Sequence, residues 1–395
     1  MPAVAKHTET AARRYDVVIV GASFAGLVAA RTAAMRGLSV AVLEAKPDVA
    51  SRVATTGILV KEAAEEIDIP HWLTRRVHGV RLYGPSLAHV DLFAPGYFFL
   101  TTDTGRLLGW LAAEAQRTGA RLLLGARFEG AERHGEIFRF KGLNIEARYI
   151  LGADGARSAV ARCFGLGRNT RFLVGLEQEY EGLGRTDPRF LHCFLDSRIA
   201  PGYLAWVAPG PAVTQVGLAV TRGRKADLPA FLAHTRHIFG YDEARVVERR
   251  AGRIPAGGVV HPWSAPGVML VGDAAGVVSP ATGGGIRLAF HFGRRAAHAI
   301  ADHILHCGPA PEYALAPALP RFRAKRILRR ALDLALPNPL IDLALTTPAM
   351  RWVASHLYFH RRGVGGIGFD AFQEQLPRWR PGEGSLRNGA ANDAG

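Results

Sequence analysis

The sequence predicts an α/β fold, in which a parallel sheet covered by helices holds an inserted antiparallel sheet and is followed by a helical C-terminal region. Three apolar runs rich in β-branched residues indicate buried strands of the parallel sheet, at residues 17–20, 149–151 and 268–271. Each run leads into a glycine-containing turn, and a helical stretch over residues 27–35 follows the first. Alternating runs such as residues 213–220, between the second and third strands, predict the inserted sheet.

The first turn carries a dinucleotide-binding fingerprint. Gly21-Ala-Ser-Phe-Ala-Gly26 has the spacing G-x-G-x-x-G, with Ser23 in place of the middle glycine. The following helix offers free N–H groups and its positive dipole end to a pyrophosphate, and the Ser23 hydroxyl could add a contact. Glu44 ends the next strand, residues 38–43, at roughly the 20-residue spacing of a ribose-binding carboxylate. Taken alone, this turn could bind NAD or FAD, or it could be a glycine-rich turn that packs a helix and binds no cofactor.

Two later turns favour FAD. Asp154-Gly155 follows the second strand, and Gly272-Asp273 follows the third, where we expect it to cap a helix. An aspartate there can accept a cofactor hydroxyl, and three successive glycines would let backbone lie against a flat ring. The predicted cofactor-binding residues are Gly21, Ser23, Ala25, Gly26, Glu44, Asp154, Gly155, Gly272, Asp273, Gly276, Pro280, Gly283, Gly284, Gly285 and Ile286.

Together these segments resemble the flavoprotein family that includes aromatic hydroxylases and geranylgeranyl reductases. The stretch Gly272-Asp-Ala-Ala-Gly-Val-Val-Ser-Pro-Ala-Thr-Gly-Gly-Gly-Ile286 is most similar to the geranylgeranyl reductase branch. The resemblance implies a FAD-binding Rossmann-like (three-layer ββα) domain with an inserted antiparallel-sheet substrate domain. It also adds Arg52 and Arg106 to the expected cofactor-binding residues.

The expected substrate pocket departs from the pattern of that branch. Thr56 stands where the branch often has a cysteine, so it is a weak catalytic candidate, with a turn hydroxyl as the alternative. Where the branch tends to carry Y-x-W-x-F-P, this chain lacks the tyrosine and the phenylalanine at their usual places. The expected substrate-contacting residues are Tyr203, Leu204, Trp206 and Ala208, with ordinary core as the alternative for the two aromatic ones.

The resemblance implies a FAD-dependent oxidoreductase acting on a hydrophobic isoprenoid or lipid substrate, and reduction of a carbon–carbon double bond is the first expectation. The same fold also supports a monooxygenase that uses NAD(P)H and O2, or a flavin-binding partner or sensor without turnover. Because no second dinucleotide fingerprint is present, NAD(P)H or a reduced electron-transfer protein would bind transiently as electron donor.

The charge balance bears on binding partners. Lys and Arg total 49 against 34 Asp and Glu, which gives a net charge of +15. We expect no nucleic-acid partner, because no reader motif or set of stacking aromatic residues accompanies the charge. The basic segment 321–336 favours contact with an anionic membrane, although the same helix could instead dock its apolar stripe on the protein.

Other features bear on location and metals. The N-terminus has no signal peptide, and no window has the roughly 20 apolar residues of a membrane-spanning helix, so a cytoplasmic protein is expected, with possible peripheral contact at the inner face of the membrane. Three scattered cysteines, Cys163, Cys193 and Cys307, argue against a disulfide scaffold and a zinc site, and no metal is expected.

The predicted domain organisation interleaves two domains along the chain. Residues 1–79, 102–168 and 263–306 form the FAD-binding domain, while 80–101 and 169–262 form a hairpin and sheet of the substrate domain. Residues 307–380 are expected to be helical, and the polar segment 381–395 to be a disordered tail.

Overall fold

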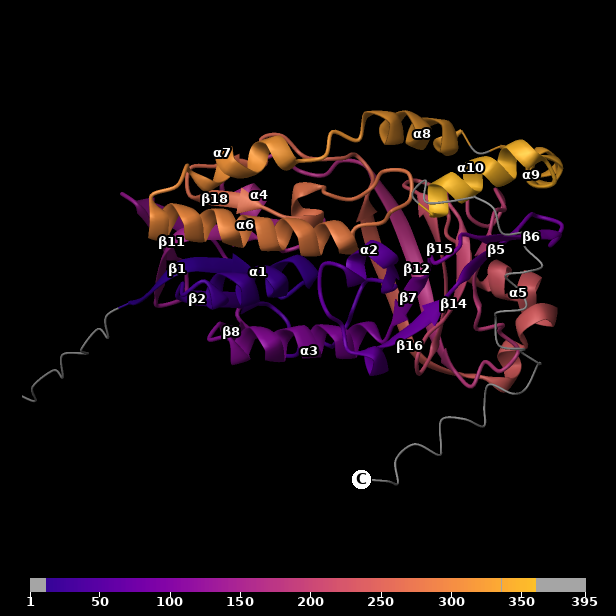
Figure 1. The fold of residues 1–395 in the computed structure, drawn as a ribbon, viewed down its shortest axis with the longest axis horizontal. Helices are drawn as coiled ribbons and strands as arrows, with labels where there is room; N and C mark the ends of the chain where they lie inside the picture. The colour runs from indigo at the N-terminus through magenta and orange to yellow at the C-terminus, as the bar shows by residue number, and fades with distance from the viewer. Residues whose placement is uncertain (1–11, 335, 360–395) are drawn as a thin grey trace, which may run out of the picture.

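A computed structural model describes residues 12–334 and 336–359 of the chain. Its largest sheet has the strand order β17-β18-β11-β1-β2-β8 (Figure 1); off this path, β10 pairs with β11, and β9 pairs with β10. Strand β1 pairs in parallel with β2 and β11, and β11 pairs in parallel with β18, so the predicted parallel sheet is present. The strands are β1 (Arg13–Val20), β2 (Val40–Glu44), β8 (Arg121–Leu124), β9 (Ala131–His134), β10 (Ile137–Phe140), β11 (Ile145–Gly152), β17 (Ser264–Ala265) and β18 (Val268–Leu270).

Three helices pack side by side on this sheet: α1 (Phe24–Met35), α3 (Thr104–Arg117) and α6 (Ile286–His306). Helix α1 lies between the other two and is buried along most of its length. Its approach to α6 requires a glycine, since a Cβ on Gly293 would lie 2.4 Å from the carbonyl oxygen of Ala25. This contact fixes α1, and therefore the turn before it, against the rest of the domain.

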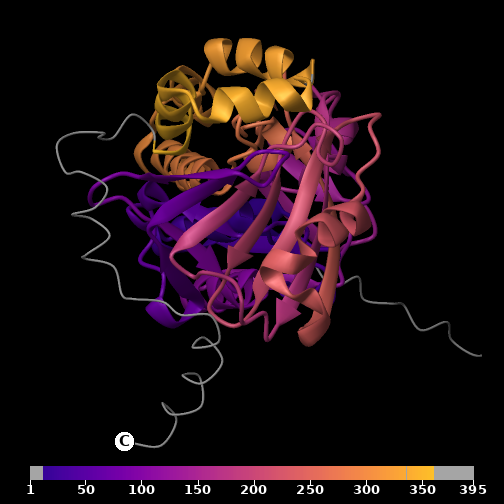
Figure 2. The same ribbon diagram turned by 90° about the vertical axis from the view of Figure 1, so that its right-hand side faces the viewer.

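The second sheet has the strand order β16-β12-β15-β14-β13-β5-β6. Neighbouring strands in this sheet are antiparallel, except that β13 and β5 pair in parallel, which the sequence alone did not predict. One face packs against helix α5 (Leu228–Phe239), as Figure 2 shows. The strands are β5 (Gly79–Tyr83), β6 (His89–Phe93), β12 (Phe172–Glu181), β13 (Phe190–Phe194), β14 (Ala205–Pro209), β15 (Thr214–Thr221) and β16 (Arg245–Pro255).

A small third sheet joins the two larger ones. It consists of β3 (Ile58–Val60), β7 (Phe99–Thr102) and β4 (Thr74–Val77), next to the short helix α2 (Lys61–Ala64) and the 3-10 turn His71–Leu73. Residues 97–101 were expected to form a short strand that leans into the substrate domain. Strand β7 pairs with β3 and β4, and Tyr97 and Phe99 pack into the apolar cluster of the second sheet.

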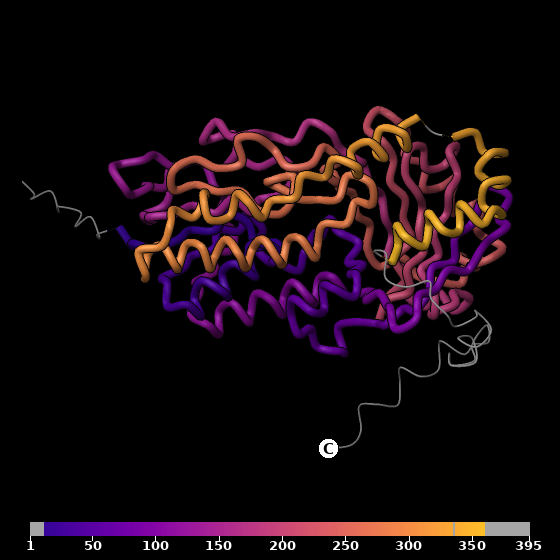
Figure 3. Tube along the Cα trace, turned by 45° about the horizontal axis from the view of Figure 1, so that its top comes forward, coloured from indigo at the N-terminus to yellow at the C-terminus, as the bar shows by residue number. Residues whose placement is uncertain are grey.

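The C-terminal region is helical as far as it is described. Helices α8 (Arg323–Asp333), α9 (Asn338–Leu345) and α10 (Pro348–Tyr358) follow α7 (Pro311–Leu315) and run across one edge of the second sheet (Figure 3). Leu345, Ala354 and Phe359 pack into the apolar cluster on the sheet face away from α5. In the described residues, no helix is long and apolar enough to cross a membrane. The predicted tail, 381–395, lies outside the described residues.

Two local expectations were wrong. The turn at Gly272-Asp273 does not cap an α-helix: a four-residue 3-10 helix, Gly272–Ala275, follows it, and α6 begins only at Ile286. The basic segment 321–336 is not one helix, because Phe322 adopts a left-handed conformation before α8 and the helix stops at Asp333.

Candidate flavin and substrate site

The three predicted cofactor segments meet at the carboxyl edge of the parallel sheet. Backbone hydrogen bonds join their turns directly: Ala153 N–H donates to Val20 O at 2.8 Å, and Val271 N–H donates to Gly152 O at 2.9 Å. The Gly21 N–H likewise reaches the carbonyl of Leu43, at 2.8 Å. Ligands of open α/β sheets bind in the crevice outside this edge, where these turns lie.

The two outer glycines of the fingerprint are required by close backbone packing. Gly21 has φ +102°, and a Cβ on it would lie 2.5 Å from Ala153 O. A Cβ on Gly26 would lie 2.0 Å from Gly21 O. Ser23, in the middle position, caps α1: its hydroxyl accepts from Gly26 N–H at 3.3 Å and donates to Ala153 O at 3.0 Å. The serine therefore holds the turn to β11, a structural role that the expected phosphate contact did not include.

The Glu44 carboxylate is held in place by the backbone. It is buried, and its two oxygens accept hydrogen bonds from Ala22 N–H and Lys46 N–H at 2.8 and 2.9 Å. Each carboxylate oxygen can accept more than one hydrogen bond, so Glu44 can still accept a hydrogen bond from a ribose hydroxyl. Glu44 lies beside the start of α1, and its contact with a cofactor ribose stays a prediction.

The two aspartates of the later turns differ in their surroundings. One oxygen of Asp154 accepts from Ala159 N–H at 2.6 Å and Val160 N–H at 3.1 Å at the start of α4 (Ala159–Cys163), while Oδ1 is buried and has no hydrogen-bond partner among the described residues. Burial raises the Asp154 pKa. Among the described residues no donor reaches the Asp273 carboxylate, and desolvation by burial raises its pKa to about 6. These unpaired acceptors fit the hydroxyl groups of FAD.

Two loops of the flavin domain rest on the same strand of the second sheet. A Cβ on Gly252 of β16 would lie 2.7 Å from Ala54 O, while a Cβ on Gly283 would lie 3.5 Å from the Ile254 side chain. Positions 252 and 254 lie on one face of β16, about 7 Å apart. Tyr203 anchors the second loop, because its hydroxyl donates to Thr282 O at 2.5 Å. Gly252 thus allows the first loop to approach this strand closely, while Gly283 allows the second loop to approach the Tyr203 hydroxyl, from which an added Cβ would lie 2.8 Å.

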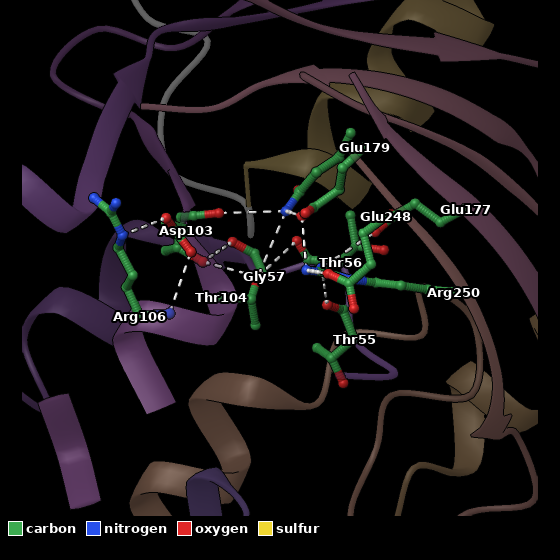
Figure 4. A network of polar contacts seen from close by, with 12 residues as sticks. Thr55, Thr56, Gly57, Asp103, Thr104, Arg106, Glu177, Glu179, Glu248 and Arg250 are labelled. Atoms are coloured by element: carbon green, nitrogen blue, oxygen red, sulfur yellow. Dashed lines mark hydrogen bonds and ion pairs between the residues drawn. The ribbon is translucent and has the colours of Figure 1, made fainter. Parts of the chain in front are cut away.

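A buried polar network lies against the first of these loops (Figure 4). Arg250 of β16 is surrounded by three carboxylates, with closest distances of 2.6 Å to Glu248, 2.8 Å to Glu179 and 3.6 Å to Glu177. It also donates to Thr55 O at 3.4 Å, which links the network to the loop of Thr56. This network was not predicted from the sequence.

Two expected cofactor residues lie at the edge of the crevice. Arg52 is exposed and has a positive φ of 47°. Arg106 is 72% exposed and pairs with Asp103, apart from the Arg250 network in Figure 4. Their contact with FAD stays a prediction, as does that of the other residues named for the cofactor.

The four expected substrate residues share one apolar surface. Trp206 and Ala208 belong to the cluster on the sheet face away from α5, and Tyr203 and Leu204 pack against it. Their neighbours Ala205 and Val207 point to the opposite face, as the alternation along a strand requires. Substrate contact at these residues stays a prediction.

Comparison with known protein families identifies the class of enzyme to which the chain belongs. Residues 88–308, more than half of the chain, match the model described as FAD binding domain, and residues 19–86 match an NAD(P)-binding Rossmann-like domain. The protein is therefore a FAD-dependent oxidoreductase with the Rossmann-like fold that the sequence predicted.

Relatives narrow the class to a family. The chain is 33% identical over 325 residues to digeranylgeranylglycerophospholipid reductase of Methanothrix thermoacetophila, covering 74% of this chain and 78% of the relative. It is 30% identical to an enzyme of that name from Methanococcoides burtonii, over 74% and 75% of the two chains. The chain thus belongs to the geranylgeranyl reductase family, which confirms the resemblance.

Solved structures agree on the fold. A geranylgeranyl bacteriochlorophyll reductase-like protein from Thermoplasma acidophilum matches with a TM-score of 0.76 and 24% identity, over 88% of this chain and 97% of that one. A p-nitrophenol 4-monooxygenase from Pseudomonas putida matches with a TM-score of 0.64 and 15% identity, over 92% and 97%. At these identities the likeness shows the fold alone.

Proposed function

We propose that the protein reduces carbon–carbon double bonds of an isoprenoid lipid, with FAD as its redox cofactor. The observation that carries this proposal is the apolar face of the second sheet, which stands against the flavin loops. Trp206, Ala208, Leu191 and Cys193 are buried there beneath the C-terminal helices, so an alkenyl chain that enters between the helices and the sheet would meet dry, apolar surroundings. When bound and reduced, FAD supplies hydride. The protein's own contribution is to hold the chain, exclude water and provide a proton.

We propose that the electron donor binds transiently, as NAD(P)H or as a reduced electron-transfer protein. The excess of basic residues supports an acidic partner, because opposite charges accelerate encounter. Reduction by NADPH alone at a useful rate would favour the nucleotide. A requirement for an added acidic ferredoxin-like protein would favour the second donor.

The C-terminal helices support peripheral contact with an anionic membrane. Ile327, Leu334 and Leu343 are 68%, 82% and 67% exposed. Arg321, Arg323 and Arg326 line a groove of about 350 Å³ beside α8, and no described carboxylate pairs with them. Exposed apolar side chains next to unpaired cations are the combination that binds an anionic lipid surface.

A single-turnover experiment tests the reaction. The FAD-loaded enzyme is reduced with dithionite and mixed without oxygen with digeranylgeranylglycerophospholipid in detergent. We expect the flavin to reoxidise and the lipid to gain two hydrogen atoms for each bond reduced, while the fully saturated lipid leaves the flavin reduced. A product that gains one oxygen atom, and only when air is admitted, would show a monooxygenase instead.

A further inference from the structure

We propose that Glu177 is the proton reservoir of the reaction and that it acts through the hydroxyl of Thr56. This inference rests on the proposed reduction of a double bond. Glu177 would be a positioning and proton-supplying residue behind Thr56, and Thr56 would be the group that touches the substrate.

Glu177 lies where the second sheet meets the flavin domain. Its side chain is only 5% exposed. On β12 it stands between Arg250 of β16 and Gly217 of β15 in the strand register. Oε2 accepts the indole N–H of Trp206 at 2.9 Å, whereas Oε1 is buried and accepts no hydrogen bond from the described residues. The nearest cation to Oε1 is Arg250 Nη1, at 3.6 Å and without a hydrogen bond, so this buried oxygen is poorly compensated as a carboxylate and favours the protonated carboxyl.

Carboxylates outnumber cations around Glu177, and this excess of negative charge favours the neutral, protonated form of Glu177. Glu179 on its own strand and Glu248 on β16 share the single guanidinium of Arg250 with it. From the flavin domain, Asp103 adds a further negative charge, which acts on Glu179. The Trp206 indole and the Thr56 hydroxyl are neutral. Burial is the largest effect, and with a smaller contribution from the Glu179 charge it raises the Glu177 pKa to about 7. Thr56, Trp206 and Arg250 act in the opposite direction and lower this pKa.

Thr56 lies between this carboxyl and the crevice. Its loop is tied to the Arg250 network, because Arg250 donates to Thr55 O at 3.4 Å, and the Thr56 carbonyl accepts from Thr104 Oγ1 at 3.4 Å. The Thr56 hydroxyl is near enough to Glu177 to lower the pKa of that carboxyl. The loop is fixed by Gly57, whose φ is +70° and whose added Cβ would lie 2.0 Å from the Thr104 hydroxyl oxygen. Thr56 is partly exposed, whereas Glu177 is buried behind it. A proton leaving Glu177 on this side therefore meets the Thr56 hydroxyl first.

The proton balance of the reaction requires such a group. Reduction of a double bond adds one hydride, which oxidises the reduced flavin, and one proton, which must come from the protein or water. In the proposed step, the O–H bond of Thr56 breaks as a C–H bond forms on the substrate. The Glu177 O–H proton moves to Thr56, which leaves Glu177 as a carboxylate until solvent reloads it. A hydroxyl is a poor acid alone, but a neighbouring carboxylic acid allows it to relay a proton.

The test measures flavin reoxidation in single turnovers between pH 5.5 and 9, with enzyme reduced by dithionite and digeranylgeranylglycerophospholipid as substrate. The wild-type rate should fall as pH rises through about 7, because the acid must be protonated. Glu177→Gln should lower the rate about 100-fold and remove the pH dependence. Thr56→Val should lower it similarly, and Thr56→Ser should restore it. Glu179→Gln should move the midpoint to lower pH, because a neighbouring negative charge is removed.

Controls separate this role from a structural one. Glu181→Gln removes an exposed carboxylate from the same strand and should leave the midpoint unchanged. As a readout without turnover, the infrared band of a protonated carboxyl should titrate near pH 7 in the apoprotein and be absent from Glu177→Gln. A wild-type enzyme that reduces neither digeranylgeranylglycerophospholipid nor a cyclic or branched isoprenoid lipid would refute the proposed function. A wild-type enzyme that turns over, with an unchanged pH profile in Glu177→Gln or an unchanged rate in Thr56→Val, would overturn this inference alone.

Discussion

Trp206 reaches Glu177 across an intervening strand. The indole of Trp206 on β14 passes over Gly217 of β15 and donates to Oε2 of Glu177 on β12 at 2.9 Å. The crossing is possible only because residue 217 has no side chain: a Cβ there would lie 2.7 Å from Trp206 Cζ2. The aromatic wall of the expected substrate surface and the buried acid are therefore one structural unit.

Gly217→Ala should disrupt this unit. The added methyl group would meet both the indole and the carbonyl oxygen of Leu176, each at 2.7 Å, so we expect a loss of about 1–3 kcal/mol in the free energy of unfolding. Urea unfolding followed by tryptophan fluorescence measures it. Gly175→Ala is the matched control on β12, because its Cβ would approach no atom closer than 3.8 Å. Equal stability of the two variants would contradict the tight crossing.

The raised Glu177 pKa predicts how stability depends on pH. A carboxyl whose pKa rises from 4.5 to about 7 on folding binds more protons in the folded state between these values. Its contribution is therefore fully present below pH 4.5 and is lost as pH rises to about 7, by about 3 kcal/mol. Glu177→Gln should flatten this part of the curve.

The measurement is urea unfolding of the apoprotein from pH 4.5 to 8. Asp154, Glu179 and Asp273 also have raised pKa values and add slope of the same sign in both proteins. The difference between wild type and Glu177→Gln isolates the one group. Parallel curves would mean that Glu177 is ionised throughout.

The turns that meet at the carboxyl edge of the parallel sheet could be predicted from the sequence because their determinants are local. A turn such as Gly21–Gly26 carries its own signal: the glycines and the strand before them are adjacent in the chain. The Glu177 network carries no such signal. Glu177 and Arg250 are 73 positions apart, and their pairing depends on the register of β12 with β16. Alternation placed Glu177 and Glu179 on one face, but nothing local shows that this face is buried.

The same distinction applies to the burial of Arg329 in the basic C-terminal segment. Periodicity correctly placed a helix there, but it could not show that Arg329 is the most buried side chain of α8, because the partners that bury it are distant in sequence. One of them, Gly202, accepts from the Arg329 guanidinium, and Thr221 binds Asp333 at 2.8 Å.

Arg329 and Arg330 should therefore respond differently to substitution by glutamine. Arg329→Gln breaks a buried pair with Asp333, at 3.0 Å, and should cost about 3 kcal/mol of stability. Arg330 is exposed, so Arg330→Gln, combined with Arg326→Gln, should leave stability unchanged but weaken binding to vesicles containing phosphatidylglycerol. Vesicle sedimentation at low and high salt measures the second effect, which screening should abolish. Absence of binding at low salt would leave these helices as a protein-only cap.

Asp273 should make FAD affinity depend on pH. Its pKa of about 6 describes the protein without cofactor, and a FAD hydroxyl that donates to the carboxylate would favour the ionised form. Affinity should then be full above pH 6 and fall as pH drops through this value. Fluorescence titration of apoprotein with FAD measures it. Asp273→Asn should bind more weakly and with little pH dependence, Asp273→Ala should lower flavin occupancy, and normal occupancy in both would remove Asp273 from the site.

Ala208 should control the width of the substrate that the protein accepts. The side chain is fully buried on the apolar face, two residues along β14 from Trp206 and therefore on the same side of the strand. Relative to the family pattern, Ala208 replaces a phenylalanine and Leu204 a tyrosine, so aromatic bulk is missing from this wall. The missing bulk widens a pocket unless neighbouring side chains fill the space. We therefore expect a substrate with a head that is bulkier than a linear prenyl chain.

Ala208→Phe tests this expectation by restoring the bulk. The variant should reduce a cyclic or branched isoprenoid lipid at least about tenfold more slowly than wild type, an effect of about 1.4 kcal/mol on the barrier. Its rate with a slim linear prenyl lipid should change less, because the added ring clashes first with the wider ligand. Both rates are measured on enzyme with full flavin occupancy, since overpacking a core can cost about 1–3 kcal/mol of stability. Leu204→Tyr is the companion variant on the same strand region, and it should shift selectivity in the same direction. An equal effect on both substrates, or faster turnover of the wide one, would show that residue 208 does not line the pocket.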